Sequence, residues 1–86
     1  MSSEKLSADP HVIREILSQH ARLGVDVAKI EETFDLISCG LTSLATVSVM
    51  LALEDRFDIE FPESMLGRDT FRSITNIQEA VAELLS

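Results

Sequence analysis

The segment Gly40-Leu41-Thr42-Ser43-Leu44 opens the element on which the rest of the chain depends. Thr42 has the side chain of a helix N-cap, because its hydroxyl can accept a backbone N–H of the first turn. Gly40 permits a turn that a bulkier residue would resist. The run SLATVSVMLALEDRFD that follows predicts a helix over residues 43–58, with Ser43 in its first turn.

This helix has two apolar faces. At about 100° per residue, one face carries Thr46, Val49, Met50, Leu53 and Phe57. One such stripe is enough to pack a helix onto a small core. A second set lies on nearly the opposite side, near Asp55 and Asp58, and consists of Leu44, Val47 and Leu51. That second face requires a ligand, a partner or another helix of the same chain to cover it.

Composition limits the class of protein. The 86 residues suit one domain with a single small core, and the helical spacing of the apolar residues predicts an all-α fold. A net charge of −8 argues against binding to nucleic acid or to an anionic membrane surface, and it favours partners that present Lys and Arg. No signal region or membrane-length apolar run is present, so we expect a cytoplasmic protein and a monomer.

The first helix is predicted to begin at Asp9-Pro10, with Asp9 as N-cap, and to end at Gly24. Residues 1–9 are polar and are expected to form a flexible N-terminus, which leaves residues 10–86 as a single domain. The apolar stripe of this helix is predicted to consist of Val12, Ile13, Ile16, Leu17, His20 and Ala21, and the place of His20 near the helix end allows partial exposure.

A long connection, residues 24–41, follows the first helix and contains too many apolar groups to be free in solvent. We expect it to wrap the bundle and to place Phe34, Leu36 and Ile37 in the core. A turn at Leu36-Ile37 is compatible with that path.

The C-terminal part predicts one short and one long helix. Pro62 opens the short helix and Gly67 ends it. Residues 68–73 form a connection anchored by Phe71, and Thr75-x-x-Gln78 is a capping box for the last helix. Its apolar stripe consists of Ile77, Ala80, Val81, Leu84 and Leu85. The chain is therefore predicted to be a small bundle of three main helices plus one short helix.

Conventional catalysis and metal binding have no support. The histidines, His11 and His20, belong to the first helix and form no Ser-His-acid pattern. The acids of residues 54–63 lack the spacing of a calcium loop. Cys39 is the single cysteine, so it forms no internal disulfide, and it is predicted to be a buried, inert thiol. We expect neither an enzyme nor a metal site.

The motif G-L-T-S-L, preceded by DLISCG and followed by an apolar helix that ends in LEDRFDIEFPE, resembles the phosphopantetheine attachment region of acyl carrier proteins and peptidyl carrier domains. The resemblance covers the chain from about Val12 to Leu85. It implies that Ser43 receives the 4′-phosphopantetheine arm of coenzyme A from a phosphopantetheinyl transferase. A phosphate ester suits this place, because free N–H groups and the helix dipole favour an anion there.

Three positions near Ser43 differ from the common fatty-acid carriers. Those proteins have Asp directly before the serine and acids two and five residues after it, where this chain has Thr42, Ala45 and Ser48. The segment MLALEDRFDIEFPESML looks more like stand-alone carriers that receive amino acids from ligases resembling truncated seryl-tRNA synthetases. The resemblance thus implies an activated amino acid, or a specialised acyl group, held as a thioester and passed to a downstream acceptor enzyme.

The partners are expected to contact Thr42 and the second apolar face of the central helix. Apolar contact with Leu44, Val47 and Leu51 would supply affinity, and Glu54, Asp55 and Asp58 would attract basic partners. A rival prediction packs this face under the long connection. A competing functional hypothesis is an unmodified, acidic helical protein–protein interaction module that docks through the same face.

Overall fold

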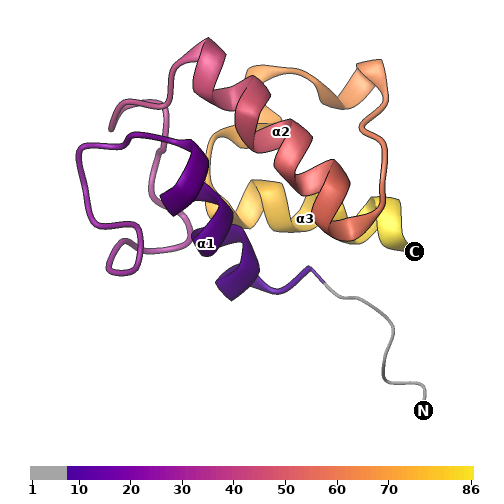
Figure 1. Cartoon of the computed structure of the whole chain (residues 1–86), viewed down its shortest axis with the longest axis horizontal. Helices are drawn as coiled ribbons and strands as arrows, with labels where there is room; N and C mark the ends of the chain where they lie inside the picture. Colours follow the sequence, from indigo (N-terminus) through magenta and orange to yellow (C-terminus); the bar gives the residue numbers. More distant parts are fainter. Residues whose placement is uncertain (1–7) are drawn as a thin grey trace.

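The computed structural model describes residues 8–86 and contains within them three α-helices, two 3-10 turns and no strand (Figure 1). The elements follow the order α1 (Pro10–His20), α2 (Ser43–Phe57), η2 (Glu63–Met65), η3 (Arg68–Phe71) and α3 (Ile74–Leu85). The expected all-α bundle, with a long loop between the first two helices, is confirmed. Residues 1–7 of the expected flexible terminus lie outside the described residues.

The first helix begins as predicted and ends earlier than predicted. The Asp9 carboxylate accepts the His11 N–H at 2.9 Å, and Ala8 before it is buried. The expectation that Gly24 ends the helix is wrong: α1 stops at His20, where Ala21 turns to an extended conformation and enters the core. This exit leaves His20 exposed, although its spacing placed it on the apolar stripe.

Helix α2 has the predicted start, and both of its ends are defined by the backbone. The Thr42 hydroxyl accepts the Ala45 N–H at 3.1 Å, and Gly40 has a φ of +116°, which disfavours any residue with a side chain. At the other end, Asp58 adopts the left-handed conformation and its N–H donates to the Glu54 carbonyl. The side chains that α2 buries are Val49, Leu53 and Phe57.

The long loop is fastened to the bundle at several points. Leu36 is fully buried, and its N–H donates to the Arg72 carbonyl at 2.6 Å. The Thr75 N–H donates to the Glu32 carbonyl at 2.9 Å. Between these two tethers the chain turns outward, so Phe34 is 41% exposed and the prediction that it lies in the core is wrong. Ile37 is half-buried.

The C-terminal part differs from the prediction in its helix starts. Residues 68–71 form η3 instead of an irregular connection, although Phe71 is buried as expected, 5.6 Å from Phe61 between ring centroids. The predicted capping box at Thr75 is also wrong. Ser73 is the N-cap of α3, and its hydroxyl accepts the Asn76 N–H at 3.1 Å, because burying Ile74 in the first turn requires an earlier start.

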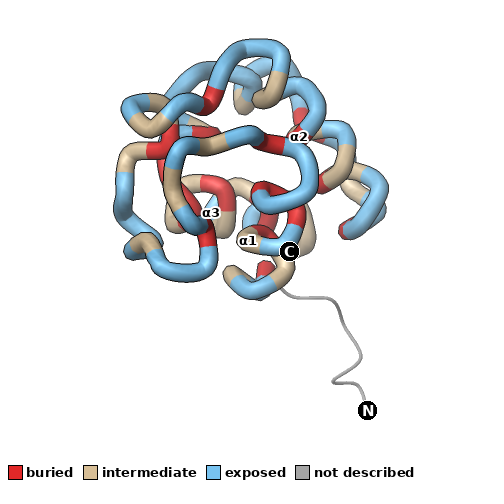
Figure 2. The backbone as a smooth tube through the Cα atoms, turned by 60° about the vertical axis from the view of Figure 1, so that its left-hand side comes forward, coloured by how far each residue is buried: buried red, intermediate tan, exposed pale blue. Residues whose placement is uncertain are grey.

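The core lies between the three helices, each of which has buried segments in Figure 2. Leu36 of the long loop belongs to the same cluster of buried side chains. The largest fully buried side chains of this core are Ile13, Leu17, Leu36, Leu53, Ile74, Ile77, Val49 and Val81. Burial of this apolar surface supplies the main free energy of folding. It also holds the start of α2 in place.

Candidate functional site

Ser43 is the first residue of α2, and its side chain is exposed. Two neighbouring hydroxyls are used by the backbone: Thr42 Oγ1 accepts the Ala45 N–H, and Thr46 Oγ1 donates to the Thr42 carbonyl at 2.8 Å. Within residues 8–86, the Ser43 hydroxyl has no hydrogen-bond partner. It is therefore the hydroxyl of this turn that is free to form a bond to another group.

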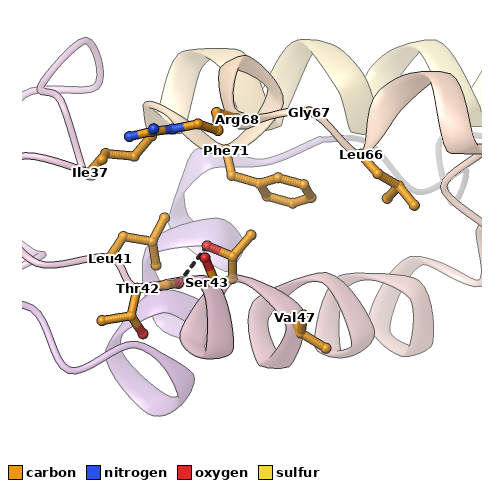
Figure 3. Close-up of a pocket in the computed structure, with 10 residues that line it drawn as sticks. Ile37, Leu41, Thr42, Ser43, Val47, Leu66, Gly67, Arg68 and Phe71 are labelled. Carbon is orange, nitrogen blue, oxygen red and sulfur yellow. Dashed lines mark hydrogen bonds between the residues drawn. The ribbon is translucent and has the colours of Figure 1, made fainter.

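An open cavity of about 480 Å³ adjoins Ser43. It separates the start of α2 from the segment of residues 66–71, as Figure 3 shows. Its walls combine apolar, hydroxyl and cationic side chains: Ile37, Leu41, Thr42, Ser43, Thr46, Val47, Leu66, Gly67, Arg68 and Phe71. A flexible chain with both amide and methyl groups finds complementary surfaces in such a cavity.

The electrostatics at the start of α2 favour a negative group. The first N–H groups of the helix and its dipole give this end a positive potential, and Arg68 adds a full charge at the same cavity. Sequence reasoning missed Arg68, Leu66 and Gly67, because it placed Leu66 and Gly67 at the end of the short helix and treated residues 68–73 only as a connection. Nothing in the local pattern predicts that they line the same cavity as Ser43.

Cys39 is the other nucleophilic side chain near this turn. It is half-buried, and its thiol donates to the Leu36 carbonyl at 3.3 Å. Burial raises the pKa of the Cys39 thiol, and the negative charge of Asp35 adds to the effect. A raised pKa favours the protonated thiol near neutral pH. Cys39 is less buried than predicted, and its inertness stays a prediction.

The second face of α2 is exposed. Leu44, Val47 and Leu51 are 81%, 48% and 54% exposed, so the long loop does not cover them. Asp55 and Asp58 are exposed near the other end of the helix. Glu54 differs from them, because it is half-buried and its carboxylate accepts the Phe61 N–H at 2.9 Å. Most of the residues that the sequence assigned to partners are therefore exposed along α2, whereas the Glu54 carboxylate is bonded within the fold.

Comparison with known proteins identifies relatives of this chain and a protein family that it matches. The family model described as "Phosphopantetheine attachment site" matches residues 11–84. An aminoacyl carrier protein of Agrobacterium fabrum is 44% identical over 73 residues, which cover 85% of this chain and 88% of that protein. A D-alanyl carrier protein of Streptococcus sanguinis is 45% identical over 51 residues, or 58% of this chain and 65% of that protein.

Solved structures agree with the sequence comparisons. A carrier protein from Agrobacterium tumefaciens, crystallised with an engineered Bradyrhizobium japonicum glycine:[carrier protein] ligase and AMP, has a TM-score of 0.82 and 42% identity. That match covers 85% of this chain and 97% of the other. The solution structure of an Agrobacterium tumefaciens protein has a TM-score of 0.71 and 42% identity, over 90% of this chain and 93% of the other.

The chain belongs to the phosphopantetheine-attachment family of carrier proteins. Its function is that of a carrier: it bears a 4′-phosphopantetheine group and holds an acyl or aminoacyl cargo, and it is not itself an enzyme. The hypothesis of an unmodified interaction module is not favoured.

None of the helices found between residues 8 and 86 has the length and apolarity that crossing a membrane requires.

Proposed function

We propose that Ser43 is the residue that carries the phosphopantetheine arm. The observation that carries this proposal is the exposed, unbonded hydroxyl at the first residue of α2. Formation of the ester joins Ser43 Oγ to the phosphate of phosphopantetheine, while 3′,5′-ADP leaves coenzyme A and the serine proton is taken up by a base of the transferase. The arm then supplies a terminal thiol on which cargo is held as a thioester.

The residues around Ser43 fit this group. The N–H groups of the first turn stabilise the phosphate, and Thr42, whose side chain holds the helix start, keeps them oriented. The adjoining cavity of about 480 Å³ has room for the part of the arm next to the phosphate. Cys39, protonated at neutral pH, does not compete with the arm's thiol for activated cargo.

Intact-mass measurement after incubation with coenzyme A and a broad-specificity phosphopantetheinyl transferase tests the site. We expect the mass of one phosphopantetheine to be added to the wild-type chain and none to Ser43→Ala. Ser48→Ala, on the exposed surface of the same helix, is the matched control and should be modified like the wild type. An unmodified wild-type chain, under conditions that convert other carriers, contradicts the proposal.

We infer that the cargo is an amino acid loaded by an ATP-dependent ligase. Two observations support this inference: the similarity to an aminoacyl carrier protein, and the similarity to a carrier seen with a glycine:[carrier protein] ligase. In addition, Thr42, Ala45 and Ser48 replace the acids that fatty-acid synthase enzymes would contact. The modified protein should accept glycine or another small amino acid from such a ligase, with ATP present. Efficient malonyl loading and chain elongation would overturn this inference.

We further propose that the transferase and the ligase contact the exposed face of α2. Leu44, Val47 and Leu51 are large apolar side chains exposed on the helix that begins at Ser43, and exposed apolar groups of this kind suit an interaction site. Asp58 lies beside the negative end of the helix dipole, where a carboxylate is locally unfavourable. A basic partner would offset that cost.

The cargo then passes to a downstream acceptor enzyme, and the localisation that we propose is the cytoplasm.

A further inference from the structure

Two separate hollows flank the start of α2, and each contains one arginine. The hollow of about 480 Å³ includes Ser43 and Arg68 in its walls. The hollow on the other side has a volume of about 370 Å³ and includes Arg22, but Ser43 does not line it. A group attached to Ser43 can therefore leave the helix along either side, and the two sides offer different cations.

Arg68 is available to a new anion. Among residues 8–86, Arg56 pairs with Glu15 and Arg72 pairs with both Asp35 and Asp69. Arg14 donates to two backbone carbonyls. Arg68 is exposed and has no carboxylate within ion-pair distance in that part of the chain, although the chain is strongly acidic and Asp69 is its neighbour in sequence.

We propose that Arg68 pairs with the phosphodiester of the arm on Ser43 and thereby directs the arm into the cavity between α2 and residues 66–71. This inference rests on the proposed attachment at Ser43. The N-terminus of a helix stabilises a phosphate without fixing the direction of the chain attached to it. A guanidinium fixes the direction of that chain, because the planar fork of the arginine donates two parallel hydrogen bonds to phosphate oxygens.

The walls beyond Arg68 suit the rest of the arm. Leu66 is 46% exposed at the edge of the cavity, and Phe71 forms part of its floor (Figure 3). The methyl groups next to the phosphate of a phosphopantetheine would contact these apolar side chains. The second hollow has Leu44 and Ala45 in its walls, together with His20, but no phenylalanine. The arginine and the apolar floor thus favour the same side of the helix.

The inference is tested by comparing the unmodified and modified forms of the wild type, Arg68→Gln and Arg22→Gln. Both variants remove one exposed arginine beside the start of α2, so a general effect of charge appears in both. Intact mass first establishes that each chain carries the arm. The backbone amide chemical shifts that change on modification are then measured by ¹H–¹⁵N NMR at low and high salt.

We expect modification of the wild type to shift the amides of Leu66, Gly67 and Phe71. These shifts should fall about twofold or more in Arg68→Gln, since the bidentate pair is lost, and Arg68→Lys should restore them in part. They should be unchanged in Arg22→Gln and weaker at high salt. Melting curves of the unmodified variants should match the wild type, because both arginines are exposed.

The contrary results are distinguishable. If the wild-type chain gains no phosphopantetheine, the proposal for Ser43 fails, and this inference fails with it. If the chain is modified but the shifts persist in Arg68→Gln, Arg68 does not direct the arm. If the shifts lie instead at Ala45 and Ser48 and disappear in Arg22→Gln, the arm occupies the other hollow.

Discussion

At the residue scale, the site depends on how three neighbouring hydroxyls are used. The Thr42 hydroxyl caps α2, and the Thr46 hydroxyl donates a hydrogen bond to the Thr42 carbonyl, so both side chains are bonded to the backbone. Of these three hydroxyls, that of Ser43 has no hydrogen-bond partner among residues 8–86, and Ser43 is exposed. A nucleophilic serine on a rigid helix start needs such neighbours, because the cap fixes its position while its own hydroxyl stays free.

Removing the cap should therefore destabilise the protein without touching Ser43. We expect Thr42→Ala to lower the free energy of unfolding by about 0.5–2 kcal/mol. Thr42→Asp should keep the free energy of unfolding near the wild-type value, because aspartate is also an N-cap residue and its negative charge suits the positive end of the helix. Urea unfolding followed by circular dichroism measures both. Equal stability of Thr42→Ala and the wild type would contradict the role of this cap.

At the element scale, α2 divides its two faces between the core and the solvent. Phe57 is 3% exposed and Val49 and Leu53 are fully buried, whereas Leu44, Val47 and Leu51 are exposed. A helix that leaves a second apolar stripe uncovered is arranged for contact with another molecule. The same helix thus connects the stability of the domain to its proposed recognition by partners.

The buried face should dominate stability. Phe57→Ala removes a large buried side chain from a small core, and we expect a loss of about 3–5 kcal/mol in the free energy of unfolding. Chemical denaturation of the two proteins, side by side, checks this value. A loss below about 1 kcal/mol would show that α2 packs through its other face.

The exposed face should dominate binding. Val47→Ala should change the free energy of unfolding by less than about 1 kcal/mol and weaken binding to the transferase and the ligase. Asp55→Asn should slow association, more so at low salt, because it removes an attractive charge. Association rates and melting temperatures should be measured on the same samples. A lower melting temperature of Val47→Ala with unchanged affinity would mean that this face is structural.

Local sequence signals predicted the starts of α1 and α2 correctly, since each depends on a cap next to it. These local signals gave the wrong end of α1 and the wrong start of α3, because tertiary packing decides both boundaries. Ala21 leaves α1 early to enter the core, and Ile74 extends α3 backwards to reach it. In the same way, the motif around Ser43 led to the proposal of this residue as the attachment site, whereas no short pattern predicts that Arg68 lines the same cavity.

At the scale of the whole molecule, the long loop is a fastened part of the domain. Arg14 of α1 donates to the Val27 carbonyl at 2.6 Å and to the Ile30 carbonyl at 2.8 Å. Leu36 and Glu32 tie the far end of the loop to the α3 side of the bundle. The loop thereby positions Leu41 and Thr42, so its tethers also position the site.

Breaking the Arg14 tether should loosen the loop. Arg14→Met keeps much of the apolar stem but removes the charged donor, and we expect a loss of about 1.5–3 kcal/mol. Amide hydrogen exchange over residues 24–36 should become faster. Arg22→Met is the control, because Arg22 makes no side-chain hydrogen bond within the described residues, and it should exchange like the wild type. Unchanged protection in Arg14→Met would show that Arg14 does not hold the loop.

The most direct test of the whole account is to locate the modification on the chain after both reactions. The protein is incubated with coenzyme A and transferase, then with ATP, glycine and a glycine:[carrier protein] ligase, and its fragments are analysed by tandem mass spectrometry. We predict phosphopantetheine on Ser43, with glycine attached to the arm through a bond that hydroxylamine cleaves. A phosphopantetheine on Ser38 or Ser48, or an unmodified Ser43 in a fully treated sample, would contradict the account.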